Sequence, residues 1–189
     1  MTANADVDYI VRINTHIRDF WADPSGWAPS DAAVLLSKSR LDLQVSLSHA
    51  LELWFEPCAE EQRDGRLILA WANLGSLIEG TLQWFLSVYE ADYSGTPVKS
   101  WRGTERDIDG LQLSQLRRYF DEHIWTSDDL HWSPWIEHVA YRRNAIHAFR
   151  DRDLGTIDEF AEDVSRYGEL VSELDGRVPY PDDDYGPYR

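Results

Sequence analysis

The amino-acid sequence predicts an all-α protein, an antiparallel bundle of about six helices. Apolar residues recur at intervals of three and four along nearly the whole chain, which is the period of a helix that buries one face. No run of alternating Val, Ile or Thr between turn residues indicates a sheet. The 189 residues are 43% hydrophobic and 13% aromatic, enough to close a core without disulfides or metals. We therefore expect a single helical domain over 1–189, with its core at 30–176.

The first half of the chain contains three of the predicted helices. A helix over 6–21 has its apolar residues on one face, ends before the Pro-Ser-Gly of 24–26 and packs beside the core. Ser30 caps a second helix, whose apolar stripe continues to Pro57. The third helix, 66–89, is the longest and has the broadest apolar band. It is predicted to be the central helix of the core.

Several residues inside this central helix are not part of its apolar band. Asn73, Glu79 and Gln83 either approach a functional site or are solvated and cap a neighbouring element, and we expect the second. Gly75 and Gly80 belong to no Gly-rich phosphate loop, because they lie within a helix. They predict close packing of a neighbour against the helix.

The second half begins with a connection and continues with three more helices. The segment 92–109 contains Gly and Pro without an apolar period and is predicted to be a surface connection, followed by a short helix over 113–124. Ser133-Pro134 is a favourable helix start and opens a fifth helix to Phe149. A capping-box pattern at 156–159 opens the last helix, which ends at Gly176. The remaining 177–189 is predicted to be a loose acidic tail.

The formal net charge of −16 restricts the partners of the protein. Such a surface repels nucleic acids and anionic membranes, so we expect no DNA or membrane partner. An RNA or nucleotide site must then be a local positive cleft. Cys58 is the single cysteine and forms no internal disulfide, which fits a small buried residue in a reducing cytoplasm. The sequence has no signal peptide and no membrane-spanning run, so we expect a cytoplasmic location.

One cluster carries candidate chemistry, the segment Arg142-Arg143-Asn144-Ala145-Ile146-His147. Four residues separate Arg142 from His147, and three separate Arg143 from the same His. Arg118 and His123 repeat the four-residue gap on the preceding predicted helix, so spacing alone does not identify a site. The later copy lies on the penultimate predicted helix, after the long core helix and before the final amphipathic helix.

This cluster resembles the motif of the HEPN superfamily, small helical domains of which many are metal-independent ribonucleases in toxin–antitoxin, phage-defence and CRISPR systems. The family motif is Arg, four to six residues and then His, often with Asn, Asp or His directly after the Arg. Arg142 has the spacing and Arg143-Asn144 has the pair, and neither Arg has both. The resemblance implies a bundle of HEPN type with Arg142, Arg143, Asn144 and His147 as catalytic residues. It also implies a homodimer that brings two motifs into one composite cleft.

The residue types suit RNA cleavage without a metal. A side chain must move a proton at the 2′-hydroxyl or the leaving oxygen, for which histidine is suited, and a cation must stabilise charge on phosphorus, for which arginine is suited. On a regular helix Arg143 and His147 share one face, whereas Arg142 and His147 lie about 140° apart. Arg142 then needs another partner, a helix irregularity or a second subunit to act with His147.

Three interpretations remain open. The protein is a metal-independent endoribonuclease, a HEPN-like module that binds a nucleotide or a protein partner without catalysis, or a plain helical interaction protein. In the last case the cluster is an ordinary polar face, with Arg143 paired to an acidic side chain and His147 hydrogen-bonded. Glu137 and His138 belong to the same region but are not expected to be functional. Phe149 occupies the position where one HEPN toxin branch has a modified Tyr, so that modification cannot occur here.

No metal and no cofactor are expected. His123, His131 and His138 are irregularly spaced, and the chain has no His-Glu-x-x-His motif and no pair of cysteines. Three tryptophans near the fifth helix lack interleaved Lys or Arg and are expected to pack against the core rather than stack on bases. These are Trp125, Trp132 and Trp135. A Trp-rich surface also suggests that part of the surface is buried in a homodimer interface.

Overall fold

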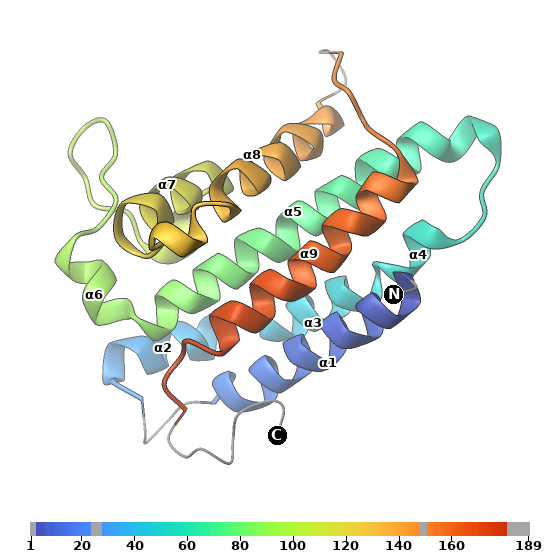
Figure 1. The fold of residues 1–189 in the computed structure, drawn as a ribbon. Coiled ribbons are helices and arrows are strands. Elements are labelled where there is room, and N and C mark those ends of the chain that lie inside the picture. Colours follow the sequence, from blue (N-terminus) through green and yellow to red (C-terminus); the bar gives the residue numbers. More distant parts are fainter. Residues whose placement is uncertain (1–2, 24–27, 148–150, 181–189) are drawn as a thin grey trace.

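Figure 1 shows the computed structural model, which describes residues 3–23, 28–147 and 151–180. Within these residues the regular structure is helical, and the one β-type pairing is an isolated bridge between Lys99 and Glu105. The expectation of an all-α fold is confirmed. Among the described helices, none combines the length and the apolar composition that crossing a membrane requires.

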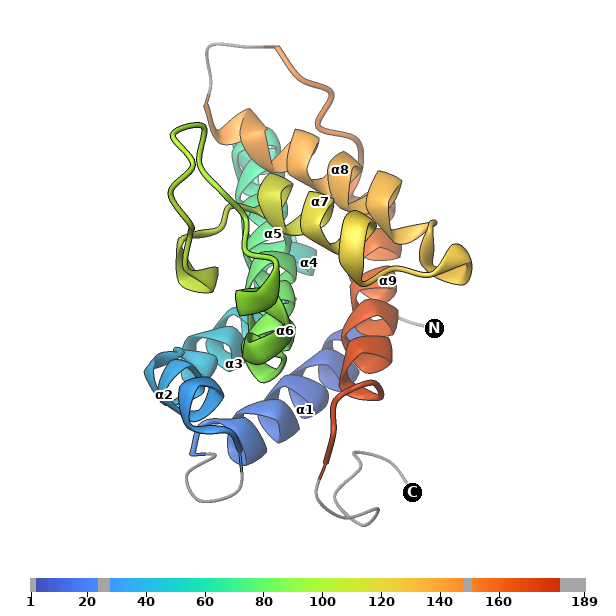
Figure 2. The same ribbon diagram turned by 90° about the vertical axis from the view of Figure 1, so that its left-hand side faces the viewer.

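The long helix α5 (Arg63–Val88) lies at the centre of the molecule, as its apolar band predicts. Two later helices, α8 (Trp132–Arg143) and α9 (Ile157–Asp175), pack along it. The first helix, α1 (Ala3–Trp21), packs on α9 and on α3 (Leu41–His49). Figures 1 and 2 show α1 beside α9 and α5 between α8 and the N-terminal helices. The first helix is part of the core, because its apolar residues Val7, Ile10, Ile13, Ile17 and Trp21 are buried there, which corrects the expectation that it packs beside a core of 30–176.

The predicted second helix over 30–57 is in fact three short helices, α2 (Ser30–Lys38), α3 and α4 (Glu52–Phe55). The chain leaves helical geometry at Ser39, which is extended (φ −65°, ψ 143°) and whose hydroxyl donates to the carbonyl oxygen of Leu36. A serine that satisfies a carbonyl at a helix end competes with the next helical turn. The break redirects the apolar stripe, so that α2 packs on α5 while α3 packs on both α1 and α5.

The segment 92–109 is more than a surface connection, which corrects the sequence prediction. It begins within α6 (Glu90–Gly95), and the hydroxyl of buried Tyr93 donates to the carbonyl oxygen of Arg106 at 2.6 Å. Val98 is also buried. The apolar residues are too sparse to show a period, yet Tyr93 and Val98 reach the core, whereas Trp101 is 86% exposed.

Short 3₁₀ turns join several of the longer helices. η1 (Glu60–Gln62) leads into α5, and η2 (Ile108–Gly110) leads into α7 (Leu113–His123). α7 confirms the predicted fourth helix to within one residue at its end. It starts with a capping box formed by the side chains and backbone of Gln112 and Gln115.

The fifth helix begins within one residue of the predicted start, but the predicted capping role of Ser133 is wrong. After η3 (Ser127–Asp129), α8 begins at Trp132, and the hydroxyl of Ser133 does not cap it. That hydroxyl donates to Asp121 at 2.7 Å and accepts from Arg117 at 2.9 Å, which ties α8 to α7. The preference of serine for helix ends is overridden by a tertiary contact.

The end of α8 also differs from the prediction, whereas the start of α9 agrees with it. α8 ends at Arg143 and continues as a 3₁₀ turn, η4 (Asn144–Ile146), while 148–150 lie outside the described residues. At the start of α9, the hydroxyl of Thr156 accepts from the Glu159 N–H at 3.2 Å, and the Glu159 carboxylate accepts from the Thr156 N–H at 2.7 Å. The predicted capping box is confirmed.

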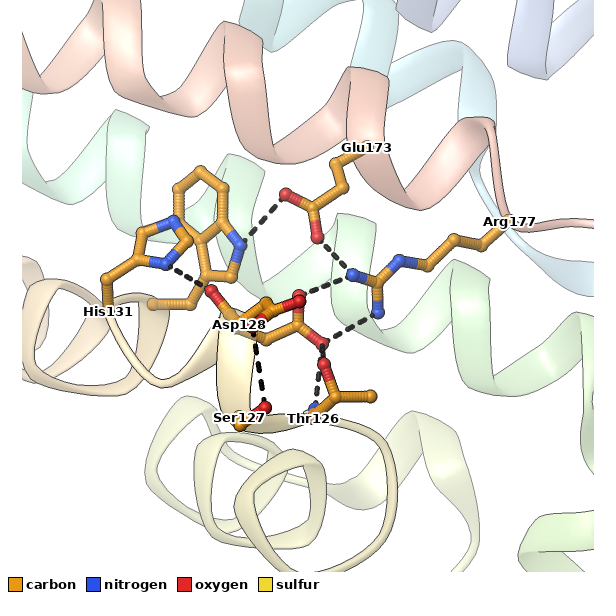
Figure 3. A network of polar contacts seen from close by, with 8 residues as sticks. Thr126, Ser127, Asp128, His131, Glu173 and Arg177 are labelled. Atoms are coloured by element: carbon orange, nitrogen blue, oxygen red, sulfur yellow. Dashed lines mark hydrogen bonds and ion pairs between the residues drawn. The ribbon is translucent and has the colours of Figure 1, made fainter.

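The first residues of the predicted loose tail, 177–180, are fixed to the body, which is a correction. Arg177 pairs with Asp129 and Glu173, and this network joins the end of α9 to η3 (Figure 3). The ring of Tyr180 packs edge-on against Phe20, with 4.7 Å between ring centroids. The rest of the predicted tail, 181–189, lies outside the described residues.

The three tryptophans near α8 are buried within the chain, which confirms that they pack against the core. The indole N–H of Trp132 donates to Glu173 at 3.1 Å, and that of Trp135 donates to Asp163 at 2.8 Å. Trp125 is buried beside Phe120. These three side chains are therefore not available for a dimer seam.

A buried polar network joins four helices through the hydroxyl of Tyr167 on α9. This hydroxyl accepts from Asn14 of α1 and Gln44 of α3, each at 3.2 Å, and lies 2.9 Å from the hydroxyl of Thr81 on α5. Asn14 also donates to Ser48 at 2.9 Å. Burial raises the pKa of Tyr167, so the hydroxyl stays neutral. The network fixes the register of α1, α3, α5 and α9 against one another.

Candidate functional site

The segment singled out by the sequence lies where α8 changes into η4. The N–H of Asn144 bonds to the carbonyl oxygens of Ala140 and Arg142, and the N–H of His147 donates to the carbonyl oxygen of Asn144 at 3.2 Å. The backbone therefore tightens from α-helical to 3₁₀ geometry between Arg143 and His147. The regular helix on which their common face was predicted does not continue to His147.

Arg142 belongs to the core and not to an open site. It is only 4% exposed, and its guanidinium carbon lies 4.8 Å from the ring centroid of Trp71. The guanidinium pairs with Glu159 at 3.2 Å and more loosely with Asp153 at 3.8 Å. Together with an N–H at the α9 cap, Arg142 holds the pKa of Glu159 below its ordinary value. Arg142 thus connects the end of α8 to the start of α9.

The backbone around Arg142 is adapted to this position. Gly155 has φ +67°, and a Cβ atom added there would lie 2.2 Å from Nη1 of Arg142. Only glycine gives both the left-handed conformation and the space for the guanidinium. Within the described residues Nη1 of Arg142 has no hydrogen-bond partner.

Arg143 takes a different direction and lies against α5. Its Nη1 atom donates to Oε2 of Glu79 at 2.7 Å, and both side chains are partly exposed. A Cβ atom at Gly75 would lie 2.5 Å from Cδ of Arg143, so the absence of a side chain at this position makes room for the arginine. Gly75 and Glu79 are one helical turn apart and together form a cradle for Arg143.

Glu79 has a second bond that belongs to another helix. The same oxygen, Oε2, accepts from the backbone N–H of Leu113 at 3.0 Å. Leu113 is the first residue of α7, where N–H groups lack partners within the helix. One carboxylate therefore joins α5, α7 and α8. Glu79 therefore caps a neighbouring element, as expected, and it also lines the candidate cleft described below, which was not expected.

Arg143, Asn144 and His147 line one cleft of about 720 Å³ between α5, the start of α7 and the end of α8. Asn144 and His147 are exposed. The wall also contains hydroxyl and amide side chains from the neighbouring helices. The lining residues are Ala72, Ser76, Glu79, Gln112, Leu113, Ser114, Ala140, Arg143, Asn144, Ile146 and His147.

The cleft is close to electrically neutral. The charge of Arg143 is offset by Glu79, and the remaining lining side chains are uncharged apart from any proton on His147. A phosphate entering the cleft finds hydrogen-bond donors but no excess positive charge within the described chain. The structure thus brings together three of the four predicted site residues and separates Arg142 from them.

No family model, curated protein or solved structure matches this chain. The site therefore rests on its own geometry.

The other sequence candidates lie outside this cleft. The second copy of the spacing, Arg118 and His123, lies on α7 beside Glu122, at 4.0 and 3.9 Å. His138 of α8 pairs with Asp163 of α9 at 3.2 Å. In the parts of the chain that the structure describes, no three His, Cys, Asp or Glu side chains are grouped to hold a metal ion.

A second cleft of about 670 Å³ was not predicted from the sequence. It lies between α4, the start of α5 and the residues before α9, and its wall is largely apolar. Trp54, Phe55, Leu67 and Ile157 belong to this wall, which also contains Arg63. Cys58 is half-buried there, which corrects the expectation of a fully buried cysteine.

Sequence reasoning missed the residues that hold Arg143 in place. Gly75 was recognised as a site of close packing, but its neighbour was not, and Glu79 was not connected to Arg143. The available signal was the four-residue spacing of Gly75 and Glu79, which places both on one face of α5. Nothing in the sequence indicates that the end of α8 lies on that face.

Proposed function

We propose that this chain is a HEPN-like, metal-independent endoribonuclease, of the kind found in toxin–antitoxin or phage-defence systems. The observation that supports the proposal is that Arg143, Asn144 and His147 line the same cleft. In this reaction the 2′-oxygen of the RNA attacks phosphorus and the bond to the 5′-oxygen breaks. His147 moves the proton, while Arg143 and Asn144 donate hydrogen bonds to the phosphate oxygens. Arg142 has a structural role in this proposal.

Proton transfer favours a site built from two copies of the chain. Cleavage requires one proton acceptor and one proton donor, and one copy supplies a single histidine to the cleft. Two clefts facing each other across a homodimer provide two His147 side chains and two Arg143 side chains.

The test is cleavage of single-stranded RNA in the presence of EDTA. We expect His147→Ala to reduce the rate at least a hundredfold, which is the usual contribution of a general acid–base residue. His123→Ala is the matched control, because it removes a histidine at the same spacing from an Arg but outside the cleft, and its rate should equal that of the wild type. A His147→Ala protein that cleaves at the wild-type rate contradicts the proposal.

A second candidate function is binding of a nucleotide or RNA without cleavage. The ion pair between Arg143 and Glu79 favours it, because a neutralised arginine stabilises developing charge less well. This candidate predicts that the wild-type protein binds RNA and leaves it intact. Arg143→Ala should then weaken binding, while His147→Ala has a smaller effect.

A further inference from the structure

The position of Glu79 indicates how the cleft is regulated. Its Oε2 atom lies 2.7 Å from the guanidinium nitrogen Nη1 of Arg143 and 3.0 Å from the backbone nitrogen of Leu113. These are two donors of the kind that a bound phosphate oxygen uses, one a cation and the other an N–H that has no partner within its own helix. The carboxylate therefore occupies the place of an anion.

We propose that Glu79 is a built-in competitor of the ligand phosphate, which must displace it from Arg143 before the cleft can bind RNA. This inference rests on the proposed function, because it concerns the same arginine. Glu79 is a positioning residue: it does not contact the reacting atoms but determines whether Arg143 is free to do so. The neutral cleft is then the closed state, and release of Arg143 gives the binding state.

The geometry allows Arg143 to leave without unfolding the surroundings. Glu79 keeps its bond to the N–H of Leu113 when the arginine moves, so its carboxylate is not left without a partner. Arg143 itself is 29% exposed and lies at the last position of α8, where the chain already changes geometry. Arg142, by contrast, is nearly enclosed between Trp71 and Glu159 and cannot exchange its partner in this way.

Gly75 supports the same interpretation from the other side of Arg143. A Cβ atom at Gly75 would lie 2.5 Å from Cδ of Arg143. The lack of a side chain at Gly75 therefore lets Arg143 lie close to α5, where it reaches Glu79. The substitution Gly75→Ala should displace Arg143 from Glu79 without changing any charge. It therefore tests whether the position of Arg143, as distinct from its charge, determines binding.

The experiment measures binding of a fluorescent single-stranded 2′-O-methyl oligonucleotide by anisotropy, because this probe has RNA phosphates but no 2′-hydroxyl to react. We expect Glu79→Gln to lower Kd about tenfold, since it removes a charged hydrogen bond with Arg143 while its amide oxygen still accepts from Leu113. The gain should disappear in the double variant Glu79→Gln, Arg143→Ala. Gly75→Ala should alter Kd with no change in net charge.

Glu159→Gln is the matched control for charge. It removes one negative charge next to the neighbouring arginine, Arg142, and its amide can still take part in the α9 capping box. If Glu159→Gln lowers Kd as much as Glu79→Gln does, the effect is one of net charge and the inference is overturned. Circular dichroism of each variant verifies that the helices are retained.

The outcomes separate this inference from the proposed function. If Glu79→Gln binds more tightly and the RNA stays intact in the cleavage assay, Glu79 competes with the ligand phosphate but the protein is not a ribonuclease. If the wild type cleaves RNA and Glu79→Gln leaves Kd unchanged, the protein is a ribonuclease but Glu79 does not compete with the ligand phosphate. If neither the wild type nor Glu79→Gln binds the oligonucleotide, both are overturned.

Discussion

At the scale of single residues, the two adjacent arginines of the motif have different roles. Successive residues of a helix point about 100° apart, so Arg142 and Arg143 cannot face the same neighbour. Arg142 is directed into the contact with α9 and stacks on Trp71, whereas Arg143 is directed onto α5 and reaches Glu79. One side chain holds the fold together, and the other is positioned at the cleft.

The buried position of Arg142 predicts that its substitution lowers stability more than substitution of exposed His147. Arg142→Met should lower the free energy of unfolding by about 2 kcal/mol, because it removes a charged hydrogen bond and a buried cation–π contact. His147→Ala should change it by less than about 0.5 kcal/mol, since an exposed side chain is removed. Urea unfolding followed by circular dichroism measures both. If Arg142→Met is as stable as the wild type and loses RNA binding, Arg142 belongs to the site after all.

At the scale of elements, an ion network fixes the residues after α9 to the turn before α8 (Figure 3). Arg177 donates to Asp129 and to Glu173, and Asp129 also accepts from the N–H and the hydroxyl of Thr126. Arg177 and then Thr126 hold the pKa of Asp129 well below its ordinary value, against the opposing effect of burial. The carboxylate is thus charged in the folded protein at any ordinary pH.

The network makes stability depend on pH with a defined sign. A carboxyl whose pKa is lower in the folded state than in the unfolded state stabilises the fold above the unfolded pKa of about 4, and this contribution is lost as the pH falls further. Asp129→Asn should therefore lower the free energy of unfolding at pH 7 by about 2 kcal/mol and make it less sensitive to acid below pH 4. Urea unfolding at pH 7, 5 and 3 measures this.

Asp42 provides the matched control. Arg40 lowers the pKa of Asp42 to about 2, but both side chains are largely exposed and screened by water. Asp42→Asn should hardly change the unfolding curve at any of these pH values. Equal losses in Asp42→Asn and Asp129→Asn would show that burial of the Arg177 network contributes nothing.

At the scale of the whole molecule, the proposed homodimer requires a surface next to the cleft. Ile146 lines the cleft and is 49% exposed, which makes it a candidate for the centre of the seam. Light scattering at micromolar concentration should give twice the chain mass of 21.9 kDa for the wild type and the chain mass for Ile146→Glu. The control is Leu130→Glu, because Leu130 is 62% exposed but precedes α8 at its opposite end. A monomeric wild type contradicts the dimer and the composite site.

The sequence by itself determined the helical class, the central helix, predicted over 66–89, and the capping box of the last helix. These features depend on side chains three or four residues apart, which interact through the helix they form. It also located the cluster at 142–147. It could not determine the break at Ser39, because the same apolar stripe fits one helix or two.

Only the tertiary structure decided which arginine faces the cleft. Arg143 contacts Gly75 and Glu79 of α5. Arg142 contacts Trp71 of α5 and Glu159 of α9. All four partners lie on helices other than α8. Helical periodicity determines the angle between adjacent side chains, but not which neighbouring helix each of them meets. That depends on how α5, α8 and α9 pack, which is a property of the whole core.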